Sequence, residues 1–140
     1  MNKIESIRGL ALGIIRKGDK ILVSPGYDKC KNEYFYRPLG GGIEFGENSQ
    51  EALKREFKEE LNAELKECRL ITVTENIFTY EGQKGHEICF IYEAQFTDSS
   101  LYEIEEFRIL DSTIDGKAVW KDLAELHKAI VYPDGINKYL

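Results

Sequence analysis

The sequence predicts an α/β fold of the α+β kind, a layered sandwich built around a mixed sheet. Three observations support this prediction. Short apolar segments come first, a strongly amphipathic helix follows them, and a β-rich stretch leads to a second helical segment near the end. The chain has 140 residues, the usual size of one domain, so we expect residues 1–140 to form a single domain.

The first third of the chain predicts a hairpin and a short strand. Residues 7–16 are almost entirely apolar and predict a buried strand, with a turn at 17–20 and a return strand at 21–23. Residues 24–33 are polar and rich in turn formers, so we expect a surface loop there. The aromatic residues of 34–37 predict a short strand that leads into three consecutive glycines.

The clearest local signal is a helix inside the stretch Gly40–Ala63. Asn48 can cap its first turn, and Glu51 lies three residues later, the spacing of a capping box. The helix is expected to stop at Asn62, because asparagine tolerates the left-handed conformation that ends many helices. Its packing face is an apolar stripe at spacings of four, formed by Leu53, Phe57 and Leu61.

Three carboxylates, Glu56, Glu59 and Glu60, lie beside this stripe at i, i+3 and i+4. At 100° per residue they fall within a sector of about 100° on one helix face. Neighbouring carboxylates repel one another unless solvent or a cation screens them, and their oxygens are ligands that Mg²⁺ and Mn²⁺ prefer. The spacing alone fits either a metal site or a solvated acidic face.

The second half of the chain predicts mostly strands. We expect strands over 68–80, 86–96, 107–110 and 118–120, with an acidic loop at 97–106. A helix over 121–129 and one short final helix follow them.

Composition limits the partners of the protein. The net charge is −6, which argues against non-specific binding to nucleic acid or to an anionic membrane. The three cysteines are far apart and odd in number, which indicates free thiols in a reducing compartment. With no signal peptide and no run of 18 apolar residues, we expect a cytoplasmic protein.

The stretch from Gly41 to Ala63 resembles the Nudix hydrolase motif G-x5-E-x7-R-E-U-x-E-E-x-G-U, where U is a bulky aliphatic residue. The positions that match at the correct spacing are Gly41, Glu47, Arg55, Glu56, Glu59 and Glu60. Three positions depart from it: Phe57 replaces an aliphatic residue, Asn62 replaces the last glycine, and Ala63 replaces a bulky residue. The resemblance implies an αβα sandwich with a Nudix-type mixed sheet.

The resemblance also implies metal-assisted hydrolysis, in which water attacks phosphorus and a pyrophosphate bond breaks. It gives Glu56, Glu59, Glu60 and the carbonyl of Gly40 as ligands of Mg²⁺, with Mn²⁺ as an alternative. Glu59 could also position water. Arg55 would orient the acidic side chains through Glu47, although a surface ion pair with Glu51 or Glu59 is the simpler alternative. The residues expected to contact substrate are Arg37, Gly41 and Gly42.

Two further groups stay open at this stage. Many members of the family use another acid from a later loop, and here Glu103, Glu105 and Glu106 lie at a suitable distance in sequence. Aromatic residues could stack on a nucleobase or ribose, although alternating aromatics in strands more often pack a sheet; they are Tyr34, Tyr36, Phe78, Tyr80 and Tyr92.

We therefore predict a hydrolase that cleaves a nucleoside diphosphate linked to another moiety. The substrate is either a nucleoside triphosphate, intact or damaged, or a nucleotide sugar such as ADP-ribose; a homodimer is compatible with this assignment. The alternatives are a catalytically inactive nucleotide-binding sensor with a Nudix fold, and an interaction domain whose acidic helix binds a basic partner.

Overall fold

The computed structural model describes residues 5–110 and 116–140. Most of the described chain lies in strands: β1 (Ile7–Lys17), β2 (Lys20–Asp28), β3 (Glu33–Arg37), β4 (Leu39–Gly42), β5 (Leu65–Tyr80), β6 (Gln83–Phe96), β7 (Glu106–Arg108) and β8 (Lys117–Asp122). The helices are α1 (Ser49–Leu61) and α2 (Leu123–Leu126), with 3₁₀ turns η1 (Ser99–Glu103) and η2 (Ile136–Tyr139). In this part of the chain, neither helix is long and apolar enough to span a bilayer.

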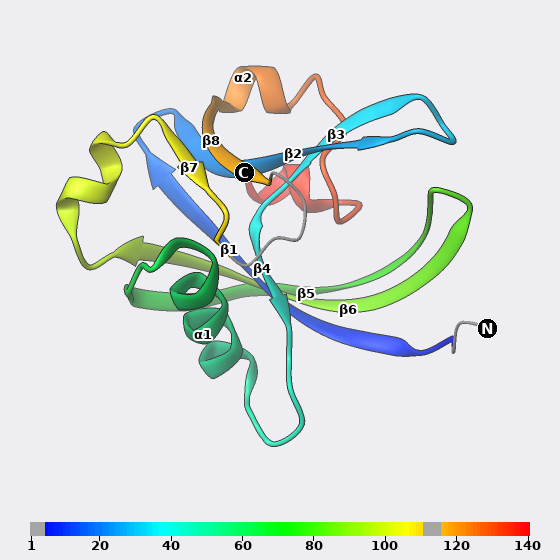
Figure 1. The fold of residues 1–140 in the computed structure, drawn as a ribbon, viewed down its shortest axis with the longest axis horizontal. Helices are drawn as coiled ribbons and strands as arrows, with labels where there is room; N and C mark the ends of the chain where they lie inside the picture. Colours follow the sequence, from blue (N-terminus) through cyan, green and yellow to red (C-terminus); the bar gives the residue numbers. More distant parts are fainter. Residues whose placement is uncertain (1–4, 111–115) are drawn as a thin grey trace.

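The sheet is mixed, as the sequence predicts, and its main path runs β5-β6-β1-β2-β8-β7. β1 is parallel to β6 and antiparallel to β4, and it pairs with β2 only near the turn, at Arg16↔Ile21 and Lys17↔Lys20. β2 then runs with β3 and β8 instead. The strands therefore diverge into two halves, and α1 and α2 lie on opposite sides of the strands (Figure 1).

β1 is buried on both faces, which explains its nearly continuous apolar sequence. Ala11 and Ile15 pack in one core with Leu53 and Phe57 of α1. The alternate residues form a second core with the C-terminal segment; its β1 members are Leu10, Leu12 and Ile14. The central strand thus fixes α1 on one side and the end of the chain on the other.

The expected loop over residues 24–33 is wrong except at 29–32, which form the turn between β2 and β3. β2 continues to Asp28 and pairs with β3 through Ser24↔Arg37 to Asp28↔Glu33. The residues that suggested a loop serve the hairpin: a Cβ added to Gly26 would lie 2.4 Å from Cζ of Phe35, so the missing side chain makes room for the ring.

The helix expected over 121–129 is present but much shorter, because α2 spans only Leu123–Leu126. The chain leaves the helix to pair with β3: the N–H of Tyr36 donates to the carbonyl of Ile130, and the N–H of Tyr132 donates to the carbonyl of Tyr36. The final helix is a single 3₁₀ turn, η2. The acidic loop likewise contains the 3₁₀ turn η1.

Candidate functional site

Helix α1 begins and ends where the sequence predicts. The side-chain oxygen of Asn48 accepts from the N–H of Glu51 at 2.9 Å, and its amide donates to the Glu51 carboxylate at 2.7 Å. Asn62 ends the helix with φ of 53°. Leu53, Phe57 and Leu61 are buried against the sheet, so the acidic face beside them has a fixed direction.

Arg55 gathers the acidic side chains around one guanidinium. Its Nη2 lies 2.6 Å from Oε1 of Glu47 and donates to the carbonyl of Gly42 at 2.8 Å. Its Nη1 lies 3.0 Å from Oε1 of Glu56 and 3.2 Å from Oε2 of Glu59. Arg55 therefore does more than form one surface ion pair with a neighbouring glutamate, because it contacts a loop, a strand and two helix carboxylates.

These contacts shift the ionisation of both partners. The hydrogen bonds from Arg55, followed by one from the backbone of Glu44, lower the pKa of Glu47. The same bond to Glu47 is the largest cause that raises the pKa of Arg55 above its usual value. Both groups are therefore charged at neutral pH, and the loop before α1 is tied to the helix by an ion pair.

The glycines of β4 are required by close packing. Gly40 has φ of 142°, and an added Cβ would lie 2.0 Å from the carbonyl oxygen of Ala11. A Cβ on Gly41 would lie 2.5 Å from both Cδ and Oε2 of Glu56. Gly41 was expected to contact substrate, and in the structure it makes room for the Glu56 carboxylate.

A cleft of about 1300 Å³ starts at this acidic face and runs between the two halves of the sheet. Gly40, Glu56 and Glu60 line one end of it. The other end is lined by residues from the two long hairpins, among them Phe35, Asn76, Phe78, Tyr80 and Tyr132. The cleft is therefore long enough to be lined both by the Nudix-like helix and by aromatic side chains.

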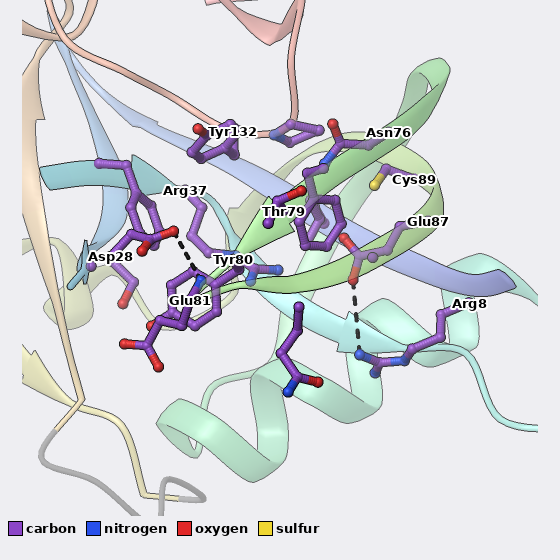
Figure 2. Close-up of a pocket in the computed structure, with 18 of the residues that line it drawn as sticks. Arg8, Asp28, Arg37, Asn76, Thr79, Tyr80, Glu81, Glu87, Cys89 and Tyr132 are labelled. Atoms are coloured by element: carbon purple, nitrogen blue, oxygen red, sulfur yellow. Dashed lines mark hydrogen bonds and ion pairs between the residues drawn. The ribbon is translucent and has the colours of Figure 1, made fainter. Parts of the chain in front are cut away.

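Arg37 lies in the middle of this cleft (Figure 2). Its guanidinium makes no ion pair within residues 5–110 and 116–140. Its positive charge nevertheless reaches its neighbours, since it is among the effects that lower the pKa of Tyr80, although burial and nearby carboxylates raise that pKa overall. An unpaired cation between the two ends of the cleft is suited to an anionic group.

The two hairpins that flank the aromatic end are tied together by Asp28. Its carboxylate is buried and accepts hydrogen bonds from the N–H groups of Cys30, Lys31 and Glu81, the last at 3.0 Å from the β5–β6 turn. Figure 2 shows this bond between Asp28 and Glu81. Sequence reasoning did not single out Asp28, and only its position after a run of strand residues could have suggested it.

The other predicted residues are distributed unevenly. Arg37, Phe78 and Tyr80 line the cleft, whereas Tyr34 is exposed and Tyr92 is buried against Ser49, with 2.6 Å between their hydroxyl oxygens. Tyr36 packs below the ammonium of Lys121. Among the described residues, those that line the cleft do not include Glu59, Gly41 or Gly42. They also do not include the exposed loop acids Glu103, Glu105 and Glu106.

The donor set of the acidic face fits a hard divalent cation in its chemistry. Glu56 and Glu60 offer carboxylate oxygens at the cleft, and the strand that carries the Gly40 carbonyl lies beside them. Within the part of the chain that the structure describes, however, no three acidic, histidine or cysteine side chains converge on one point. A cation would therefore draw Glu56 and Glu59 away from Arg55, which both now contact.

This arrangement of a glycine strand, an acidic helix and a mixed sheet belongs to the Nudix class. The family model of the NUDIX domain matches residues 8–133, and the chain belongs to this family. Nudix hydrolases act on small nucleotide-linked substrates and generally use divalent metals.

Solved structures share the same fold. The MutT Nudix hydrolase from Burkholderia pseudomallei has 20% identity and a TM-score of 0.64, with 96% of this chain and 95% of that chain covered. The mutator MutT protein from Bacillus halodurans has 21% identity and a TM-score of 0.63, with coverage of 94% and 78%. A Nudix hydrolase from Nitrosomonas europaea has 18% identity and a TM-score of 0.65, with coverage of 92% and 82%. At such identities the likeness establishes the fold.

Proposed function

We propose that this protein is a Mg²⁺-dependent pyrophosphohydrolase, with residues 1–140 acting as one Nudix domain. It cleaves a nucleoside diphosphate linked to another group, by attack of water on phosphorus. The observation that carries the proposal is the Arg55 network, which joins Glu47 and Glu59 to Glu56, a carboxylate that lines the large cleft.

The acidic end of the cleft supports the metal part of the proposal. Glu56, Glu60 and the Gly40 carbonyl would hold the cation, with Glu59 as a further ligand. When bound, a divalent cation neutralises phosphate oxygens and activates water. Arg55 and Glu47 act as positioning residues, because their ion pair sets the direction of the helix carboxylates.

Arg37 supports the phosphate part of the proposal. It lies in the cleft with no carboxylate partner among the described residues, so its charge is available to a phosphate oxygen. Gly41 and Gly42 serve this site indirectly, by leaving space for Glu56 and by accepting from Arg55. A bound phosphate would then meet positive charge on the side opposite the acidic helix face.

A substrate screen tests the proposal. Purified protein with Mg²⁺ or Mn²⁺ is incubated with nucleoside triphosphates, their oxidised forms and nucleotide sugars such as ADP-ribose, and released phosphate is read after phosphatase coupling. We expect one of these two classes to be cleaved, and chelation by EDTA to stop the reaction. No cleavage of any compound at high enzyme concentration would overturn the proposal.

One observation favours the second candidate, a nucleotide-binding sensor without turnover. The acidic side chains do not converge within the described residues, and Arg55 already neutralises two of them. The sensor reading predicts nucleotide binding in calorimetry and no hydrolysis in the screen. The third reading, a basic partner for the acidic helix, predicts binding to neither nucleotides nor Mg²⁺.

The proposal includes a cytoplasmic location, which the free thiols of Cys30, Cys68 and Cys89 support. A homodimer is compatible with it and can be tested by light scattering.

A further inference from the structure

Asn76 of β5 is a buried amide at the aromatic end of the cleft. Its side chain is 5% exposed, and its Oδ1 has no hydrogen-bond partner among the described residues. Buried polar groups are nearly always satisfied, because leaving one unpaired is unfavourable. Asn76 lines the cleft, so a bound molecule can supply the missing donor.

A second acceptor lies directly beside Asn76. The register of β5 and β6 places Asn76 opposite Glu87, and residues so paired project from the same sheet face. The Glu87 side chain is 13% exposed, also lines the cleft, and lies 3.8 Å from Nη1 of Arg8, beyond hydrogen-bond distance. The two side chains thus project from neighbouring strands on one face of the sheet, and Figure 2 shows them on one wall of the cleft.

Cys89 adds no charge to the wall next to these oxygens, where Glu87 is ion-paired with Arg8. Cys89 follows Glu87 on the same face of β6 and is 1% exposed. Burial, and then the negative charge of Glu87, raises the pKa of the Cys89 thiol to about 11, so it is neutral at physiological pH. Asn76 and Glu87 are therefore the acceptors of this wall, and the neutral Cys89 thiol adds no charge to them.

Two aromatic rings near this wall pack directly over glycines. Phe78 pairs with Gly85 across the β5–β6 hairpin, and a Cβ on Gly85 would lie 2.2 Å from Cζ of Phe78. Phe35 lies over Gly26 in the same way on the β2–β3 hairpin. Because both rings line the cleft, they offer faces on which a planar heteroaromatic ring can stack.

We propose that this end of the cleft binds a nucleobase with an exocyclic amino group, whose N–H donors are accepted by Asn76 and Glu87 while the ring stacks on Phe78. The inference rests on the proposed function in taking the substrate to be a nucleotide, and it names the part of the substrate that is selected. A base with a carbonyl in place of the amino group would bring a third acceptor against two others, so the site discriminates against it.

Binding without turnover tests this base site. Calorimetry in EDTA compares two pairs of ligands that differ in one amino group: ADP with purine riboside 5′-diphosphate, and GDP with IDP. We expect the wild-type protein to bind the amino-bearing member of at least one pair about fivefold more tightly or better. Asn76→Ala should reduce that preference to within about twofold.

Asn137→Ala is the matched control. The Oδ1 of Asn137 is also buried without a hydrogen-bond partner among the described residues, but Asn137 lies in η2 and does not line the cleft. The preference should survive in this variant. If Asn76→Ala keeps the preference as well, Asn76 is a structural residue and the inference is wrong.

Two more measurements cover the cases in which the donor is a sugar hydroxyl or the Asn76 variant does not fold. If Asn76→Ala instead removes a preference for ADP over 2′-deoxy-ADP, the donor is a sugar hydroxyl and the base assignment is overturned. If Asn76→Ala does not fold, Gly85→Ala replaces it. Displacement of the Phe78 ring should lower the affinity for both ligands of a pair about equally. Unchanged affinities would contradict the stacking. Because no step needs hydrolysis, an amino preference can hold even where the substrate screen fails.

Discussion

Glu56 occupies the space that a side chain at position 41 would need. A Cβ built on Gly41 would lie 2.5 Å from Cδ of Glu56, closer than such carbons approach in folded proteins. β4 and α1 are therefore fitted to each other at the carboxylate that we propose as a metal ligand. The glycine in the motif is needed for the position of a helix side chain as well as for backbone conformation.

Gly41→Ala should accordingly displace Glu56 and lower turnover about 100-fold, since a shift of about 1 Å at a reacting centre can have that effect. The protein should remain folded, because α1 keeps its buried stripe. Steady-state kinetics and circular dichroism measure both. Gly9→Ala is the control: its added Cβ would lie 3.4 Å from Cδ1 of Ile43, an ordinary contact, and its φ is not positive, so turnover should be unchanged. Equal effects at both positions would contradict the role of Gly41.

Arg55→Lys should lower turnover about 10- to 100-fold, as removal of a partner that orients ligand side chains typically does. Lysine keeps the charge but cannot contact Glu47, Gly42 and Glu56 at the same time. The rate should not be restored by raising the substrate concentration. Arg69→Lys, at an exposed pair 3.4 Å from Glu93, is the control and should behave as wild type. A fully active Arg55→Lys would show that charge alone suffices.

Sequence reasoning identified the helix and its acidic face because both depend on local rules. The capping box of Asn48 and the stop at Asn62 follow from local rules, whereas the pairing of Arg55 with Glu47 was implied by the resemblance to the Nudix motif. At the aromatic end of the cleft, Phe78 and Tyr80 were suggested by sequence, but Asp28 and Asn76 were not, because they acquire their surroundings from strands far away in sequence. No local pattern records which residue lies opposite in a sheet.

The hairpin over residues 20–37 was missed for the same reason. Pro25 and Gly26 look like turn residues, yet Gly26 is the position over which the ring of Phe35 packs. Packing accounts for two of the three departures from the motif. Phe57 is 1% exposed and Ala63 is 1% exposed in the core beside α1, so the larger residue at 57 and the smaller one at 63 lie in the same core.

Phe57 and Gly13 should show strong coupling in stability. A Cβ on Gly13 would lie 3.0 Å from Cε1 of Phe57, so the glycine accommodates the ring. Gly13→Ala and Phe57→Leu should each destabilise the fold by about 1–3 kcal/mol, the first by overpacking and the second by leaving a void. The double variant should cost at least about 1 kcal/mol less than their sum. Urea denaturation measures this cycle, and strict additivity would refute the contact.

Asp28→Asn should loosen the tie between the two hairpins and weaken the fold in a pH-dependent way. Burial alone would raise the pKa of Asp28, but hydrogen bonds from Glu81, Lys31 and Cys30 outweigh it and lower that pKa below 3.8. The stabilisation is therefore present above the unfolded-state pKa near 3.8 and is lost as pH falls through the lower folded-state value. Wild type and variant should differ most at pH values above the unfolded-state pKa, such as pH 7, and converge as pH falls below the folded-state pKa.

Hydrogen exchange locates this effect. The amide of Glu81 should exchange about tenfold faster or more in Asp28→Asn at pH 7, because it loses a carboxylate acceptor. Asp98→Asn is the control, since the Asp98 carboxylate accepts hydrogen bonds from Ser100 in its own turn and not from the β5–β6 hairpin among the described residues. Protection of Glu81 that does not change, or a stability difference that grows towards acid, would contradict the assignment.

Glu60→Gln should lower turnover by at least about 100-fold while the fold stays intact, because it removes a ligand charge from the cleft with almost no change in volume. A second readout does not depend on activity: the Kd for Mn²⁺ from calorimetry should rise about tenfold or more. Glu64→Gln, an exposed residue beyond the end of α1, should change neither quantity. If Glu60→Gln binds Mn²⁺ as wild type does and still loses activity, Glu60 acts on water or substrate, and Glu56 must find its partner ligands elsewhere.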